Sequence, residues 1–192
     1  AVRFRDRLEA ARHDILEVSL AEPIRYAGGD PVEAWAARAL LLGAGPVPGQ
    51  VIDDAIPDSV TYRELTGGEL RADEQLLREV FGLLVTAHYR TEPDDLARLL
   101  DGSNLAVRAL FEEGHVVAVA LLGREGGLPA ATRGAVARGE RIRGNMLPDV
   151  LMSQLRDEAA GRPVGLRVVR IATHDAVRSR GLGSALLDAV AT

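Results

Sequence analysis

Cysteine and lysine are both absent from this 192-residue sequence. Without cysteine, disulfides, thiolate metal ligands and cysteine nucleophiles are excluded, which fits a reducing compartment. Without lysine, the chain has neither a Schiff-base lysine nor the lysine of a P-loop. Any ATP site must therefore lie outside this chain.

Aromatic residues and long apolar runs are also scarce. Aromatics make up 4% of the chain, and although 47% of the residues are hydrophobic, no window approaches the ~18 uninterrupted apolar residues of a membrane span. Residues 1–18 are charged throughout and lack the apolar core of a secretory signal. We expect a cytoplasmic protein with no membrane partner.

The charge is unevenly distributed. The chain has 23 basic and 28 acidic residues, a net charge of −5, yet residues 124–192 hold 11 arginines and 7 acidic residues, a net charge of +4. Such a basic last third indicates either a bound anionic ligand or a solvated arginine-rich surface, and charge leaves both open. The length fits one domain with part of a second.

The first quarter of the sequence predicts helices and then a linker. Apolar residues at helical spacing predict helices over residues 3–18 and 31–45, the second with Asp30 as N-cap and Pro31 in its first turn. Glycines and prolines then predict a linker over residues 43–59. We place a domain boundary near Pro57.

The rest of the chain predicts an α/β fold. A short strand (60–65), two helices (72–90 and 93–101) and a hairpin (104–125) with its turn at Glu112–Gly114 follow from periodicity and turn residues. The glycine- and arginine-rich region 124–163 predicts one helix, over 147–159. Residues 166–174 predict a strand too apolar for a sheet edge, followed by a glycine loop and a helix to the C-terminus.

That last unit carries the most informative motif. Arg178, Gly181 and Gly183 form the spacing RxxGxG directly before a helix. Glycines let a backbone approach a ligand closely, and the first N–H groups of a helix attract anions, so a pyrophosphate would fit there. Glycines also serve ordinary turns, and the spacing alone leaves that alternative open.

The run VVRIATHDAVRSRGLGSALL resembles motif A of the GNAT acetyltransferase superfamily. Three further segments, EPIRYAGGDPVEAW, LLVTAHYRTEPDDLARLLD and RGNMLP, resemble one branch of it, the tRNA(Met) cytidine acetyltransferases, and occur in the same order. The resemblance implies a GNAT-type α/β fold, incomplete at its C-terminus and preceded by a short helical segment. Residues 1–56 would be the end of a helicase-like ATPase module with its linker, and residues 57–192 the first part of the GNAT module.

The resemblance also implies an activity. An enzyme of this branch transfers acetyl from acetyl-CoA to N4 of a cytidine of tRNA(Met), at the wobble position, and ATP and Mg²⁺ would be used in the ATPase module. Ile171, Ala172 and Thr173 would contact the acetyl-pantetheine part of acetyl-CoA. The pyrophosphate loop would comprise Arg178, Ser179, Arg180, Gly181, Leu182, Gly183 and Ser184. Relatives more often have glutamine at the first loop position, where an arginine can still pair with phosphate.

Histidines are the candidates for proton transfer. His174, at the end of the cofactor strand, matches a position at which the resemblance places a catalytic group, and imidazole titrates near neutrality. The alternative is a strand-end histidine that only hydrogen-bonds the loop. His13 is expected to be solvated, His88 to pack or cap, and His115 to lie in the hairpin turn. No two of them have the close spacing of a metal site, so no metal is expected.

The segment ARGERIRGNMLP carries Arg138, Arg141 and Arg143 within six residues. Such a cluster would contact RNA phosphates, although a flexible surface loop is equally compatible. Two rival functions also remain open. One is a GNAT enzyme acting on a small amine or a protein N-terminus, and the other is a non-catalytic fragment that binds the cofactor or RNA.

Overall fold

The computed structural model describes residues 8, 10, 11, 16, 18, 25–49, 52, 56–87 and 92–192. It divides into two compact units, Ala1–Ala39 and Leu40–Thr192. In the first unit, helix α2 spans Pro31–Ala39. Asp30 caps it as predicted, since its Oδ1 accepts the N–H groups of Val32 and Glu33 at 2.8 and 3.0 Å. The helix predicted over residues 3–18 falls mostly outside the described residues.

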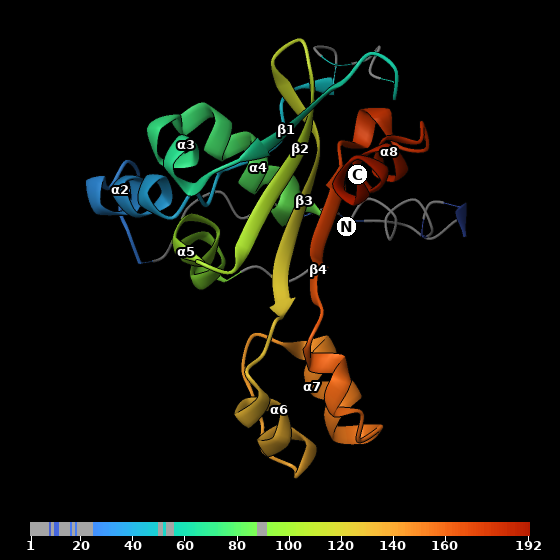
Figure 1. Cartoon of the computed structure of the whole chain (residues 1–192). Helices are drawn as coiled ribbons and strands as arrows, with labels where there is room; N and C mark the ends of the chain where they lie inside the picture. The colour runs from blue at the N-terminus through green and yellow to red at the C-terminus, as the bar shows by residue number, and fades with distance from the viewer. Residues whose placement is uncertain are drawn as a thin grey trace. The chain divides into compact units, whose positions relative to one another are not determined.

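The second unit is built on a four-stranded antiparallel sheet in the order β1-β2-β3-β4 (Figure 1). The strands are β1 (Thr61–Leu65), β2 (Leu105–Glu112), β3 (His115–Gly126) and β4 (Val164–Thr173). The predicted hairpin is confirmed as β2 and β3. Its turn uses Glu113 and Gly114, both with positive φ.

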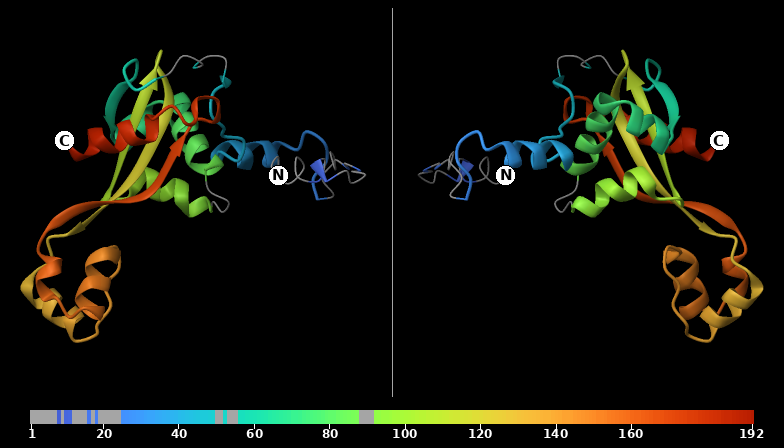
Figure 2. Two further views of the ribbon diagram at one scale, coloured as in Figure 1. Left: turned by 90° about the vertical axis from the view of Figure 1, so that its right-hand side faces the viewer. Right: turned by 90° about the vertical axis from the view of Figure 1, so that its left-hand side faces the viewer.

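Helices cover both faces of this sheet, which gives the α/β architecture that was expected (Figures 1 and 2). On one side lie α3 (Gly67–Ala72), α4 (Glu74–Thr86) and α5 (Pro93–Asp101), and on the other lies α8 (Leu182–Ala191). Each side has its own apolar core. Val80, Leu83 and Leu84 of α4 belong to the first, and Leu182 and Leu186 of α8 to the second.

The predicted linker contributes to these cores. Ala44 packs against the first core cluster, and Val47 and the fully buried Ile52 pack in the second. The linker backbone at Gly45 packs closely against α4, and this contact depends on Gly82. A Cβ at position 82 would lie 2.5 Å from the carbonyl carbon of Gly45. The domain boundary near Pro57, with ranges 1–56 and 57–192, stays a prediction.

Between β3 and β4 the chain forms a small lobe, which projects beyond the ends of these strands (Figure 2). It contains α6 (Ala130–Ala137), α7 (Met146–Gln154) and the short 3₁₀ helix η2 (Glu158–Gly161). Val136 and Met152 form its buried interior. The helix predicted over 147–159 is observed as α7 and ends at Gln154, earlier than predicted. Arg156 has a left-handed φ of 54°, which does not fit an α-helix. Helix α6 was not predicted.

Within the described residues, β4 does not have the interior position that its sequence predicted. Its apolar sequence predicted a strand inside the sheet, whereas among the described residues β4 pairs with β3 alone and lies at the sheet edge. Val164, Leu166 and Val168 are 53%, 45% and 40% exposed. Apolar composition was interpreted as burial between two neighbouring strands, and composition cannot distinguish that from an uncovered edge. No helix in the described part of the chain is long and apolar enough to cross a membrane.

Candidate acetyl-CoA site

The candidate site lies where β4 ends and the chain turns into α8. A short 3₁₀ helix, η3 (Asp175–Val177), follows the strand, and Val177 is fully buried. The loop then turns through two left-handed residues, Ser179 with φ 64° and Gly181 with φ 85°, the latter at the N-cap of α8. This conformation costs little at glycine but is uncommon for serine. The loop geometry thus explains why the motif has a glycine at position 181.

A cavity of about 480 Å³ opens at this turn. It brings together nine of the ten residues predicted to hold the cofactor, and Ala87 of the α4 end also lines it. Arg180 is the predicted residue that does not line the cavity. The nine are Ile171, Ala172, Thr173, Arg178, Ser179, Gly181, Leu182, Gly183 and Ser184.

Gly183 has a different role from Gly181. Its φ is not positive, and a Cβ added to it would meet only Thr173 Oγ1, at 3.6 Å. The fold itself therefore does not require glycine at position 183. Since the residue lines the cavity, the missing side chain leaves room there for a ligand to approach the first turn of α8.

The charge of the cavity suits an anion. Among the described residues that line it, Arg178 is the one with a charged side chain, and its Nη2 lies 2.6 Å from Asp175 Oδ1. Both side chains are at least half exposed, so this ion pair is weak and Arg178 can exchange its partner for a phosphate. The first N–H groups of α8 lack acceptors within their own helix and add the positive end of its dipole. The residues present fit a pyrophosphate.

His174 lies at the end of β4 as predicted, but it does not line the cavity. It is 5% exposed, and both ring nitrogens contact backbone groups. Nδ1 accepts the N–H of Ala176 at 3.2 Å, and Nε2 lies 2.7 Å from the carbonyl oxygen of Val47. These contacts match the alternative left open by the sequence, a histidine that hydrogen-bonds the loop. The catalytic role of His174 stays a prediction.

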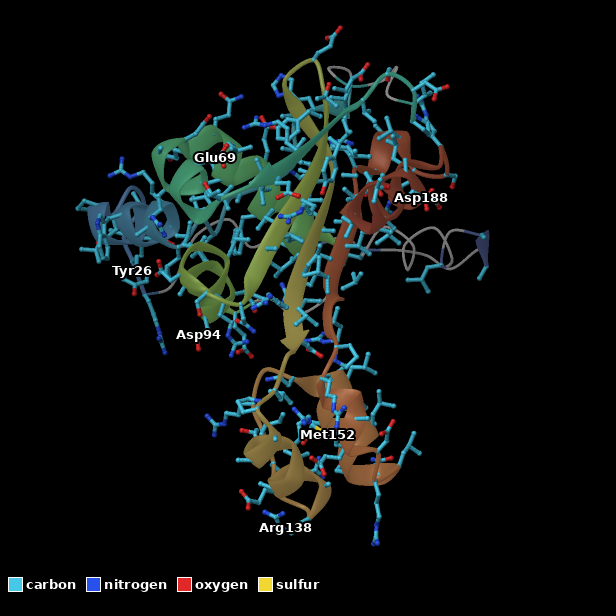
Figure 3. All side chains as sticks on the ribbon, in the orientation of Figure 1. Tyr26, Glu69, Asp94, Arg138, Met152 and Asp188 are labelled. Atoms are coloured by element: carbon cyan, nitrogen blue, oxygen red, sulfur yellow. The ribbon has the colours of Figure 1, made fainter. Side chains whose placement is uncertain are left out.

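The three arginines predicted to contact RNA lie together on the lobe. Arg138 ends α6, Arg141 and Arg143 follow it, and all three side chains are exposed. Figure 3 shows Arg138 at the tip of the lobe and Met152 inside it. Arg141 contacts Asp149 at 3.0 Å while keeping 76% of its side-chain surface exposed. The cluster is available to a partner.

A second cavity, of about 410 Å³, was missed by the sequence reasoning. Arg98, Arg167 and Arg170 line it, together with Asp95 and Asn104. The two strand arginines within LRVVRIAT were the available signal, because charged residues in an apolar strand need a partner. Their partners, however, come from distant positions in the chain.

Asp95 is one of these partners. Arg170 Nη2 donates to its Oδ2 at 2.7 Å. Burial by itself raises the pKa of this carboxyl, but the N–H of Glu92 and the Arg170 guanidinium outweigh burial, and the net pKa lies below its ordinary value. The bond fixes the start of α5 to β4 beside the cavity.

Of the other three histidines, the structure describes His115. His115 is the first residue of β3, directly after the turn in which it was predicted to lie, and its Nδ1 is 3.0 Å from Oε1 of the buried Glu79. His13 and His88 lie outside the described residues. Within the described ranges, no group of three or more potential metal ligands comes together.

The fold and the glycine loop at the end of β4 together define an acetyltransferase module of the GNAT type. Residues 79–192, more than half of the chain, match the family GNAT acetyltransferase 2, and the chain belongs to that family. Residues 1–43 match a second family, the helicase domain of the RNA cytidine acetyltransferase NAT10/TcmA. The predicted fold class and family are thereby confirmed.

Curated relatives extend this similarity over almost the whole chain. The tRNA(Met) cytidine acetyltransferase TmcA of Haloarcula marismortui is 66% identical over 190 residues, which cover 99% of this chain and 24% of that protein. The TmcA of Haloferax volcanii is 66% identical over 97% of this chain and 25% of its own length, and that of Pyrococcus furiosus is 36% identical over 98% and 23%. The chain thus spans about a quarter of the length of these relatives.

Solved structures with a similar arrangement are more distant. A Drosophila melanogaster polyamine N-acetyltransferase matches with 21% identity and a TM-score of 0.41, covering 69% of this chain and 68% of that one. A ribosomal-protein-alanine N-acetyltransferase from Brucella melitensis matches with 15% identity and a TM-score of 0.40, covering 69% of each. Likenesses at this level carry no argument about the acceptor.

Proposed function

We propose that the full-length protein transfers the acetyl group of acetyl-CoA to N4 of a cytidine of tRNA(Met), at the wobble position, with ATP used outside this chain. The observation that carries the proposal is the cavity at the end of β4, which gathers the glycine loop, Arg178 and the last residues of the strand. The TmcA relatives at 66% identity support the choice of acceptor.

The cofactor assignment follows the chemistry of the two parts of the cavity. The pyrophosphate would lie at Arg178–Ser184, where backbone N–H groups and a guanidinium meet. The pantetheine arm carries amides, which complement the backbone groups on the outer edge of a strand. Ile171–Thr173 at the edge of the sheet would supply those groups.

The chemistry of the acceptor explains why the reaction would need more than a cofactor site. The exocyclic amine of cytosine is conjugated with its ring and is a poor nucleophile, so the reaction requires accurate placement against the thioester. The base must also leave its stack, which costs a few kcal/mol. The similarity of residues 1–43 to a helicase domain supports an ATP-driven module that exposes the base.

The RNA would approach over the exposed arginines of the lobe. Arg138, Arg141 and Arg143 lie within six positions of one another and make no contact with the acetyl-CoA cavity. Phosphate contacts of this kind position an RNA without reading its sequence. The choice of tRNA(Met) would therefore depend on further parts of the full-length protein.

The experiment compares the full-length wild type with Gly183→Val. Both are incubated with acetyl-CoA, ATP and tRNA(Met), N4-acetylcytidine is measured by nucleoside mass spectrometry, and acetyl-CoA affinity is measured by calorimetry. We expect the valine to weaken acetyl-CoA binding at least tenfold, because its side chain fills space beside the first turn of α8. Gly165→Val is the matched control, since a Cβ at Gly165 meets nothing within 4 Å and the residue does not line the cavity.

Each rival gives a different result. Equal acetyl-CoA affinity in folded wild type and Gly183→Val contradicts the cofactor site. Acetylation of a small amine or a protein N-terminus, without N4-acetylcytidine, supports the first rival. Acetyl-CoA or RNA binding without any product supports the non-catalytic rival.

A further inference from the structure

Two segments far apart in the sequence cross just before the cofactor loop. Residues Val47–Gly49 lie against the turn His174–Ala176, and the carbonyl oxygen of Val47 is 2.7 Å from His174 Nε2. The approach is very close at Gly49, where a Cβ would lie 2.7 Å from the Cβ of Ala176. Glycine at position 49 therefore permits a contact that any other residue would disturb.

The hydrogen bonds fix the state of the imidazole. A carbonyl oxygen only accepts, so Nε2 carries the proton and donates it to Val47. The N–H of Ala176 donates to Nδ1 at 3.2 Å, so Nδ1 is unprotonated. The ring is thus neutral, buried and satisfied on both nitrogens. Such a ring connects two backbone segments and has no free lone pair for a substrate proton.

The turn held by His174 continues directly into the candidate site. Thr173 before it and Arg178 after it both line the acetyl-CoA cavity. Within the turn, Val177 is fully buried in the same core cluster as Ile52, which follows the crossing segment along the chain. A shift of the segment near Val47 would therefore move the first residue of the cofactor loop.

We infer that His174 is a positioning residue, which holds Val47–Gly49 against the turn before the cofactor loop and so fixes that loop in its binding conformation. The inference rests on the proposed acetyl-CoA site. It departs from the assignment of His174 as the proton acceptor. The crossing segment lies outside both family matches, since the helicase-domain match ends at residue 43 and the acetyltransferase match begins at residue 79.

The experiment uses five variants of the full-length protein. His174→Asn keeps a side-chain oxygen able to accept the N–H of Ala176 but is too short to reach Val47. His174→Ala removes both bonds. Gly49→Ala introduces the Cβ that meets Ala176, Ala176→Gly removes its counterpart, and the fifth variant combines these two. Acetyl-CoA Kd, KM and kcat are measured together with hydrogen exchange of residues 178–184 in the absence of ligand.

We expect His174→Asn and Gly49→Ala to weaken acetyl-CoA binding roughly tenfold, the effect of one lost hydrogen bond, and to speed exchange in the loop. The kcat at saturating acetyl-CoA should stay within about twofold of the wild type, because no reacting group is lost. Ala176→Gly combined with Gly49→Ala should restore wild-type affinity, since the two Cβ atoms no longer meet. A variant that only loosens the fold would not be rescued in this way.

Other outcomes overturn the inference. A kcat lowered ~100-fold in His174→Ala with unchanged Kd identifies a general base instead. Unchanged affinity and unchanged loop exchange in both His174→Asn and Gly49→Ala exclude a positioning role, and so does failure of the double variant to recover. If the wild type itself does not bind acetyl-CoA, the proposed function fails, and the loop exchange still decides whether His174 holds the loop.

Discussion

Glu125 connects the lobe to the sheet, and its replacement by glutamine should loosen that junction. The carboxyl is 5% exposed at the end of β3. Its Oε1 forms an ion pair with Arg167 of β4, and its Oε2 accepts the N–H of Leu147 at 3.0 Å, at the start of α7. Glutamine preserves the shape but replaces one acceptor oxygen with a donor. One of the two bonds is then lost, and two donors face each other.

The expected magnitude follows from those two bonds. Losing a hydrogen bond to a charged group and leaving a donor unsatisfied costs about 2 kcal/mol, which corresponds to ~30-fold faster local opening. In Glu125→Gln, the amide of Leu147 should therefore exchange its hydrogen ~30-fold faster than in the wild type. Peptides from residues 144–155 report this by mass spectrometry, and peptides from α4 serve as the internal control.

The difference should also depend on pH. Burial raises the pKa of Glu125, but the hydrogen bonds from Arg167 and from the Leu147 backbone outweigh it, so the folded pKa lies below the ordinary 4.5. A lowered folded pKa adds stability above the unfolded value, and this stability is lost as pH falls through the folded pKa. The ratio of variant to wild-type exchange should shrink toward one below pH 4.5. Equal exchange at pH 7, or a ratio unaffected by acid, would refute the reasoning.

Two further predictions concern other parts of the chain. Glu79→Ala should destabilise the hairpin turn by about 2–3 kcal/mol, because His115 and the N–H of Val116 lose a buried partner. Amide hydrogen exchange in the turn measures this loss, and an unchanged exchange rate would show that the buried carboxylate is dispensable. Replacing Arg138, Arg141 and Arg143 together by alanine should lower the salt slope of tRNA binding by about 2–3 while leaving acetyl-CoA affinity unchanged. Salt-titrated binding isotherms with coincident slopes would remove these arginines from the RNA surface.

Regular periodicity made much of the fold predictable. The apolar spacing of residues 76–85 predicted α4, and two apolar runs joined by a turn around Glu112–Gly114 predicted the hairpin. Helix α6 was not predicted, because its sequence AATRGAVA consists mainly of small residues and has no apolar stripe. Helix α3 was also not predicted, although Thr66 and Glu69 at its start form a capping box, which can be recognised in the sequence.

The candidate site was predictable where it is local in sequence. RxxGxG and the resemblance to motif A selected residues that the fold gathers around one cavity. The bonds of His174 were not predictable, because Val47 is 127 residues away and contributes a backbone carbonyl, which every residue has. The arginine-lined second cavity was missed for a related reason: its residues come from α4, α5, β2, β3 and β4 and approach one another only in the folded chain.

The uncovered edge of β4 has a practical consequence for work with this chain. A strand edge carries backbone donors and acceptors that can pair with any other extended segment. Here Val164, Leu166 and Val168 add apolar side chains along the same stretch. Residues 1–192 produced alone should therefore self-associate through strand addition as protein concentration rises, and replacing Leu166 with a charged residue should raise the concentration at which this begins.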